Sequence, residues 1–135
     1  MRRVSFEVFH MSWKYFTEEE MACTHCGECE MDDDFMAMLD QLRELYGKPL
    51  KITSGYRCPE HNIEKVKKKA GAHTTGAAAD LGLHGDAAYE IVKLAQEIGF
   101  TGIGIAQKGH IGTRFIHVDN LGGDDHFPRP WIWSY

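Results

Sequence analysis

Apolar residues recur at steps of three and four between positions 33 and 46, and this spacing predicts an amphipathic helix. The apolar stripe consists of Phe35, Met38, Leu39, Leu42 and Leu45. Acidic residues at positions 32–34 suit the helix N-terminus, where the backbone dipole is positive. Gly47, followed by Pro49, is expected to end the helix at about Tyr46.

Two further helices are predicted. One opens at Pro59, a residue favoured in the first turn, and runs through a lysine cluster up to Gly71. The cluster comprises Lys65, Lys67, Lys68 and Lys69. The other helix starts at about Gly85, turns an apolar stripe inward and is closed by Gly99.

Short runs with strand character alternate with these helices. The runs cover residues 50–53, 77–83, 102–106 and 114–118. This order of elements predicts an α+β fold, in which helices pack on a small antiparallel sheet. The chain has 135 residues and neither a repeat nor a linker. We therefore expect one domain over residues 1–135, with a cysteine-containing N-terminal segment at about 1–31.

Composition and charge argue against two classes of binding partner, nucleic acids and membranes. The chain carries 20 acidic and 15 basic residues, a balance that argues against a nucleic-acid partner, which is bound through cationic side chains. No apolar run approaches the ~18 residues needed to cross a bilayer, so no membrane partner is expected. Residues 1–16 lack the apolar stretch of a secretory signal. These observations predict a cytoplasmic protein, and we expect a monomer.

The chain has eight histidines, and two of them fit a metal site. Gly76 allows a turn after His73, and the strand that follows presents Asp80 between small residues. If the last predicted strand lies beside this one, His117 converges on the same point. Two imidazoles and one carboxylate with an open fourth position are typical of catalytic zinc. A surface or core role for each histidine is the alternative, and spacing alone does not decide between them.

Three motifs in one order add a resemblance. They are SGYRCPEHN at Ser54–Asn62, HTTGAAADL at His73–Leu81 and FIHVD at Phe115–Asp119. Together they resemble the M15 family of zinc D-Ala-D-Ala carboxypeptidases and related peptidoglycan peptidases, whose pattern is S-x-H-x-x-G-x-A-x-D followed later by a histidine within a strand. Gly71 stands where that pattern has its serine. The resemblance implies a hedgehog/DD-peptidase-like fold with zinc on a sheet face.

The resemblance also implies roles for matching residues. His73, Asp80 and His117 would bind one catalytic zinc ion, and Arg57 would bind a carboxylate of the peptide substrate, as its fork of donors suits. Ser54 and Tyr56 would shape the same pocket. The implied partners are peptidoglycan stem peptides, cut at bonds of D-amino acids by carboxypeptidase or endolysin-type endopeptidase action. A phage-derived product released to the cell wall is one way to reach them.

One position departs from the family pattern. Members often carry an acidic general base three residues before the last histidine, where this chain has Arg114. Asp119 is the nearest alternative, either as the base or as a hydrogen-bond partner of His117. His110 is a candidate for stabilising the oxyanion. Because Arg114 replaces the usual base, an alternative function is a zinc-bearing module that binds peptidoglycan without cutting it.

The four cysteines allow several states. Cys23, Cys26 and Cys29 form C-x2-C-x2-C, and Cys58 lies within the first motif. They could hold a second, structural zinc, with His25 replacing one of them, form disulfides, or stay free. The same spacing begins iron–sulfur patterns, but nothing else in the sequence indicates electron transfer. An interaction protein organised by this cluster is a further alternative.

Two glycine- and aromatic-rich segments complete the sequence-based expectations. Gly102 and Gly104 leave one face of their strand bare, where either a substrate peptide or another element of the fold could lie. The C-terminal Trp131, Trp133 and Tyr135 are expected to pack back on the sheet.

Overall fold

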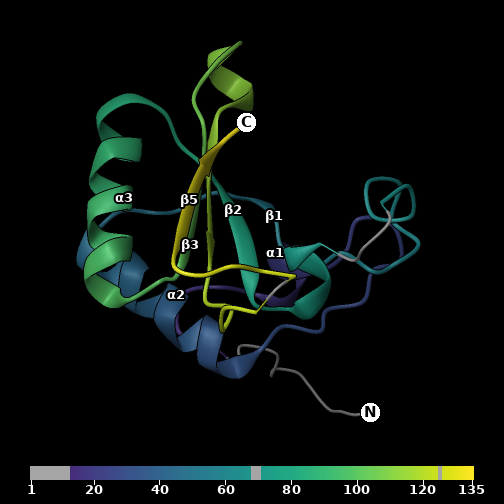
Figure 1. The fold of residues 1–135 in the computed structure, drawn as a ribbon. Coiled ribbons are helices and arrows are strands. Elements are labelled where there is room, and N and C mark those ends of the chain that lie inside the picture. The colour runs from purple at the N-terminus through teal and green to yellow at the C-terminus, as the bar shows by residue number, and fades with distance from the viewer. Residues whose placement is uncertain (1–12, 68–70, 125) are drawn as a thin grey trace.

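The computed structural model describes residues 13–67, 71–124 and 126–135, and it has an α+β fold around a five-stranded sheet (Figure 1). The strands are β1 (Ile52–Ser54), β2 (Ala78–Gly82), β3 (Gly102–Ala106), β4 (Phe115–Asp119) and β5 (Trp131–Ser134). The helices are α1 (Glu18–Met21), α2 (Asp33–Tyr46) and α3 (Gly85–Ile98), with 3₁₀ turns η1 (Ala72–Thr75) and η2 (Ile111–Thr113). The strand order is β1-β2-β4-β3-β5.

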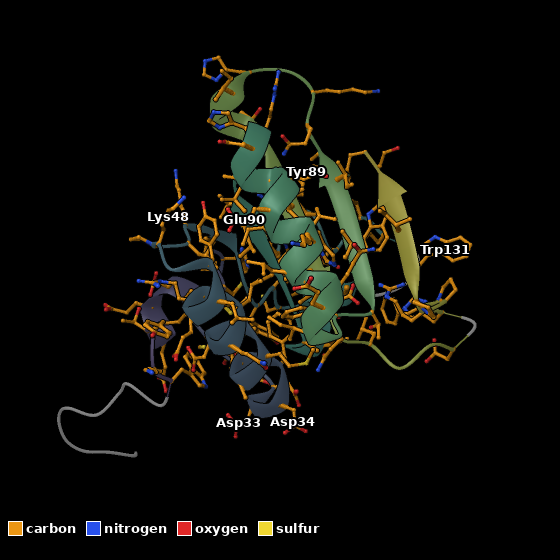
Figure 2. The ribbon with its side chains drawn as sticks, turned by 90° about the vertical axis from the view of Figure 1, so that its left-hand side faces the viewer. Asp33, Asp34, Lys48, Tyr89, Glu90 and Trp131 are labelled. Carbon is orange, nitrogen blue, oxygen red and sulfur yellow. The ribbon has the colours of Figure 1, made fainter. Side chains whose placement is uncertain are left out.

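The two long helices form where the apolar spacing predicted them. The Asp32 side chain caps α2 by accepting the Phe35 N–H at 2.8 Å, and Gly47 ends the helix with a left-handed φ of 79°. Gly99 ends α3 in the same region of backbone space. Figure 2 shows Asp33 and Asp34 at the beginning of α2.

The hydrophobic core lies between these helices and one face of the sheet. It contains Leu39 and Leu42 of α2, Ile91 and Ala95 of α3, and Leu81, Ile116 and Val118 of the central strands. Side chains alternate along a strand, so the residues between those core positions point to the other face. That second face carries Asp80, His117 and Asp119.

The prediction of a helix opening at Pro59 is wrong for the residues that can be described. Residues 59–67 form successive turns, and 68–70 lie outside the described residues. An isolated helix of this length needs a buried apolar face for stability. Ile63 and Val66 are 47% and 78% exposed, so the segment has no such face.

The sheet is mixed, whereas the sequence predicted an antiparallel one. The C-terminal residues form β5, which pairs parallel to β3, while the pairs β1–β2, β2–β4 and β3–β4 are antiparallel. The aromatic C-terminal residues therefore belong to the sheet as its edge strand, and Trp131 and Tyr135 remain 56% and 57% exposed. Figure 2 shows Trp131 projecting outward from this edge strand.

No helix in the described part of the chain is both long enough and apolar enough to span a membrane.

Candidate metal centre

His73, Asp80 and His117 meet on the sheet face that is opposite the helices. The β2–β4 register pairs Asp80 directly with His117, and η1 brings His73 in from the loop before β2. Asp80 Oδ1 lies 3.2 Å from His73 Nε2 and 3.0 Å from His117 Nδ1. All three side chains are buried, and one ligand atom from each lies within 4.8 Å of the others.

The outer nitrogen of each imidazole has a partner that fixes the ring's tautomer. His73 Nδ1 lies 2.8 Å from the Gly55 carbonyl oxygen, which can only accept, so this nitrogen carries the proton. His117 Nε2 lies 2.7 Å from Asp119 Oδ2 and donates to that carboxylate. In the neutral rings the inward-facing atoms, His73 Nε2 and His117 Nδ1, are therefore unprotonated lone pairs.

Burial and hydrogen bonding set the charges of this cluster. Burial raises the pKa of Asp80, but the imidazoles of His117 and His73 beside it outweigh burial and hold the pKa well below its usual range. Burial also raises the pKa of Asp119, yet His117 and Arg129 lower it to about 2. Burial lowers the pKa of His117, and its two carboxylate partners reverse the shift and raise it. The site thus favours positive charge between its ligands.

The three inward-facing groups fit a bound metal ion. Two imidazole lone pairs and a carboxylate oxygen are all acceptors, and acceptors at this separation need a cation or protons between them. Two nitrogens and one oxygen suit zinc, whereas calcium and magnesium prefer all-oxygen sites.

Asp119 is fully buried behind His117 and has no free acceptor site. Its oxygens accept from Arg129 Nε at 2.8 Å and Nη2 at 2.7 Å, from His117 Nε2, and from the Leu121 N–H at 3.4 Å. A carboxylate offers about four acceptor positions, and these four donors occupy them. The geometry matches that of a residue that orients a ligand histidine.

The bare glycine face of β3 is covered by the protein itself. A Cβ on Gly102 would collide with the Asp119 carboxylate, and one on Gly104 would lie 2.7 Å from the Trp133 indole nitrogen. The Trp133 ring lies over both His117, at a centroid separation of 5.0 Å, and the Arg129 guanidinium. These glycines therefore make room for the support of the metal centre, and close packing within the fold accounts for them.

Arg57 lies at the edge of the same centre. Its Nε donates to Ser54 Oγ at 3.1 Å, its Nη1 donates to Glu64 Oε2 at 3.1 Å, and its Nη2 lies 3.6 Å from Asp80 Oδ2. Glu64, itself buried, also accepts from Lys67 and from the Gly71 N–H. Two of the five guanidinium N–H groups are used in these hydrogen bonds, which leaves donors for a ligand.

These residues line a hollow of about 520 Å³. Its lining comprises Arg57, Ile63, Lys67, Ala72, His73, Asp80, Phe115, His117, Phe127, Arg129, Trp133 and Tyr135. Asp80 is the one carboxylate among these lining residues. Ser54 reaches the site through Arg57, whereas Tyr56 is buried against Cys23 and Cys58 and does not line this hollow.

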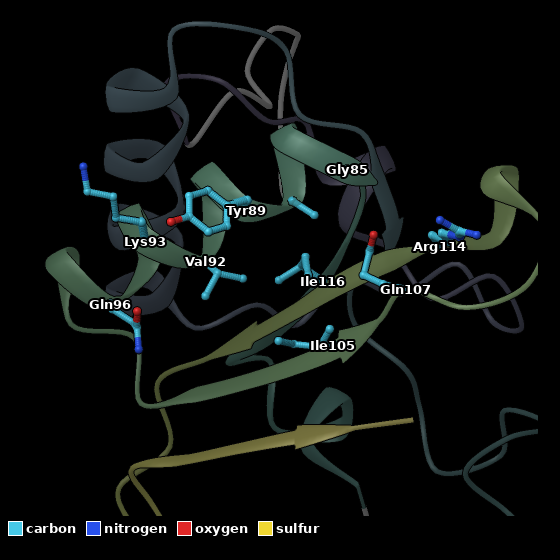
Figure 3. A pocket seen from close by; sticks show the side chains of 10 residues that line it. Gly85, Tyr89, Val92, Lys93, Gln96, Ile105, Gln107, Arg114 and Ile116 are labelled. Atoms are coloured by element: carbon cyan, nitrogen blue, oxygen red, sulfur yellow. The ribbon is translucent and has the colours of Figure 1, made fainter.

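A second hollow of similar volume lies on the opposite face, between α3 and strands β3 and β4 (Figure 3). Its walls are mostly apolar, with Val92, Ile105 and Ile116 at the centre. Arg114 lines this hollow and donates to the Gly109 carbonyl, so its side chain does not face the metal centre. His110 accepts the Gly112 N–H in the same exposed loop and does not line the metal-centre hollow.

A comparison with models of known protein families tests the family resemblance that the three motifs indicated. The profile described as Peptidase M15 matches residues 14–119, which is most of the chain. The chain belongs to the peptidase M15 family. This membership makes it a metallopeptidase by family, and M15 peptidases are zinc-dependent. A search of curated proteins finds no match to the chain.

Sequence reasoning missed several residues of this M15 site. Arg129 and Trp133 lie beyond the three motifs. Glu64 lies in the segment for which the sequence predicted a helix and whose described residues form turns. Aromatic residues at alternate positions 131, 133 and 135 were the available signal, because that period is typical of a strand. No local signal in the sequence pairs Arg129 with Asp119.

Proposed function

We propose that this protein is a zinc-dependent peptidase that hydrolyses peptidoglycan stem peptides at bonds of D-amino acids, with carboxypeptidase action favoured. The observation that carries the proposal is the buried set of inward-facing acceptors on His73, Asp80 and His117, with the Arg57 guanidinium beside it. His73, Asp80 and His117 would hold the zinc. When bound, zinc polarises a carbonyl group and activates water.

The charge of the hollow supports a substrate with a carboxylate. Arg57, Lys67 and Arg129 line it, and the metal adds further positive charge. Stem peptides offer a C-terminal carboxylate, and Arg57 has donors left to bind it in the two-point manner that guanidinium groups favour. Ser54 and Glu64 hold the guanidinium in place. A terminal carboxylate bound beside the metal would place the last peptide bond at the reacting point, which favours carboxypeptidase over endopeptidase action.

Aromatic rings also line the hollow. Phe115 and Tyr135 pack together at a centroid separation of 5.1 Å, and Trp133 packs on His117. We infer that these rings exclude water from the metal centre and contact the aliphatic side chains of the peptide. A drier site strengthens the electrostatic interactions within it.

Asp119 is better suited to orienting His117 than to removing a proton from water. Its four acceptor positions are occupied, and it is buried and does not line the hollow. We therefore assign it as a positioning residue, with Arg129 as its counterion. This assignment replaces the general-base role that the sequence left open.

The absence of a second carboxylate from the described lining supports a competing function, which is a zinc-bearing module that binds stem peptides without cutting them. The experiment that separates the two is mass spectrometry of purified muropeptides after incubation with the zinc-loaded protein. Loss of a terminal D-alanine is the expected result. Cleavage inside the stem or cross-bridge would assign an endopeptidase, and intact muropeptides that bind to zinc-loaded protein would assign the binding module.

A further inference from the structure

Three of the four cysteines gather at a second point, away from the histidine centre. Cys23 and Cys58 are buried and Cys26 is exposed, and their sulfur atoms lie within 4.8 Å of one another. The fourth, Cys29, lies outside this group. The cluster joins the N-terminal segment to the loop after β1.

The turn that carries Cys23 and Cys26 is tightly closed. The Gly27 N–H donates to the Cys23 carbonyl at 2.8 Å, and the Cys23 N–H donates to the Glu28 carbonyl at 2.7 Å. Gly27 adopts a φ of 79°, which other residues rarely adopt. This closure points both sulfur atoms to the same side of the turn.

The Cys23 sulfur is surrounded by backbone donors. It accepts from the N–H groups of Cys58 at 3.3 Å and His25 at 3.4 Å. Burial raises the pKa of this thiol, but the backbone donors of Cys58, Cys26 and His25 outweigh it and lower the pKa to about 7. Such an environment stabilises a thiolate, which is the form that binds metals.

The separation of the sulfurs suits a shared ion. Tetrahedral zinc with Zn–S bonds of about 2.3 Å places its sulfur ligands roughly 3.8 Å apart. A disulfide would join two of the three sulfurs and leave the last one unused, whereas an ion uses all three. Zinc in a structural site takes four ligands.

His61 is the candidate for the fourth ligand. It follows Cys58 with two residues between them, so the spacing reads C-x2-C and then C-x2-H. Its Nε2 lies 3.1 Å from the hydroxyl of Thr24, within the Cys23–Cys26 turn. The group of ligand atoms within 4.8 Å of one another contains the three sulfurs but not His61. The Nδ1 of the ring accepts the Ile63 N–H at 3.1 Å, so metal binding requires the ring to turn toward the sulfurs and to give up its present hydrogen bonds.

We propose that Cys23, Cys26, Cys58 and His61 form a second, structural zinc site. Cys58 follows the segment whose Gly55 carbonyl holds His73 and whose Arg57 faces the hollow. The Tyr56 N–H donates to the Met21 carbonyl, and a Cβ on Gly55 would lie 2.6 Å from that same oxygen. The ion would therefore fix the segment of residues 55–57 at its C-terminal end, next to Cys58. The proposal does not depend on the peptidase function.

The test uses a His73→Ala/His117→Ala variant, so that zinc at the first centre does not contribute. We expect one zinc per chain by mass spectrometry of the metal content after dialysis. Cobalt substitution should then give the strong near-ultraviolet absorption of thiolate-to-cobalt charge transfer. Adding Cys26→Ser should remove both signals, and Cys29→Ser, the matched control, should leave both unchanged. Because Cys26 is exposed, its replacement does not disturb the core, and circular dichroism checks this.

His61→Ala should weaken zinc binding at least about tenfold. Three outcomes would overturn the proposal: no metal with four reactive thiols, a disulfide within the cluster, or zinc retained in Cys26→Ser. An unchanged affinity in His61→Ala would remove His61 from the ligand set. None of these readouts involves hydrolysis, so they leave the proposed function to its own test.

Discussion

The two candidate metal sites of this protein are built in opposite ways. His73, Asp80 and His117 are no more than 5% exposed, lie on or beside paired central strands, and have partners that fix each ring. The cysteine cluster lies on turns, combines two buried thiols with an exposed one, and is held by backbone N–H groups. Rigid strands beside an open hollow suit reaction chemistry, and turns from two distant segments suit a cross-link. From this difference we expect the histidine and aspartate centre to control turnover and the cysteine cluster to control stability.

The largest expected effect is on hydrolysis. His117→Ala removes a ligand and the partner of Asp119, and we expect muropeptide cleavage to fall at least about 10³-fold, since it loses more than a single oxyanion donor. Arg114→Ala is the matched control, because Arg114 lines the hollow on the other sheet face. Equal losses in both variants would contradict the assignment of the catalytic face.

The next effect concerns the support behind His117. Arg129→Met leaves Asp119 buried without its counterion, and breaking such a pair costs about 3–5 kcal/mol of unfolding free energy. We also expect zinc affinity at the first centre to fall about 10–100-fold. Adding Asp119→Asn removes the unpaired charge and should restore stability without restoring affinity. Denaturant unfolding and zinc titration measure the two effects, and a stable single variant with unchanged affinity would contradict the positioning role.

The cysteine site should show the reverse pattern. Cys26→Ser should lower the free energy of unfolding by about 2.7 kcal/mol when free zinc is a hundredfold above its dissociation constant. In folded molecules the hydrogen bond from the Tyr56 N–H to the Met21 carbonyl still holds the segment that carries Arg57, so hydrolysis per folded molecule should stay near that of the unaltered protein. Thermal unfolding with and without added zinc is the measurement. A loss of turnover without a loss of stability would break the distinction between the two sites.

The smallest effect comes from Glu64, whose carboxylate holds Arg57 and the Gly71 N–H. Burial raises the pKa of Glu64, but the Gly71 N–H, Lys67 and Arg57 outweigh it and hold the pKa below its ordinary value of 4.5. The stability that this carboxylate supplies is therefore present above pH 4.5 and is lost as the pH falls through the lowered value. Glu64→Gln should cost about 2 kcal/mol at neutral pH. Unfolding curves from pH 7 to pH 3 should show that difference shrinking, and a difference that grows with acidity would contradict the sign.

The sequence predicted the elements whose signal is local. The apolar spacing of α2 and α3 and the alternation around Asp80 and His117 follow from periodicity within single segments, so both helices and the shared strand face were predictable. The turns after Pro59 were mispredicted, because a favoured first residue does not compensate for a missing apolar stripe.

Features that depend on contacts between distant segments could not be predicted. The parallel pairing of β5 and the Arg129–Asp119 pair join residues that no local pattern connects. The sequence allowed Cys58 to join the N-terminal cysteines, but only the fold shows that Cys58 lies at that turn and that Cys29 does not belong to the group. The glycines of β3 were noticed, yet only the fold shows that Asp119 and Trp133 occupy the space they leave.

The most direct measurement is muropeptide cleavage by the unaltered protein, His117→Ala and Cys26→Ser, each assayed as folded protein with its zinc content determined. The account predicts cleavage with two zinc ions in the unaltered protein, cleavage with one in Cys26→Ser, and no cleavage with one in His117→Ala. Cleavage by His117→Ala at the unaltered rate would contradict the central claim that the buried histidine and aspartate centre carries the reaction.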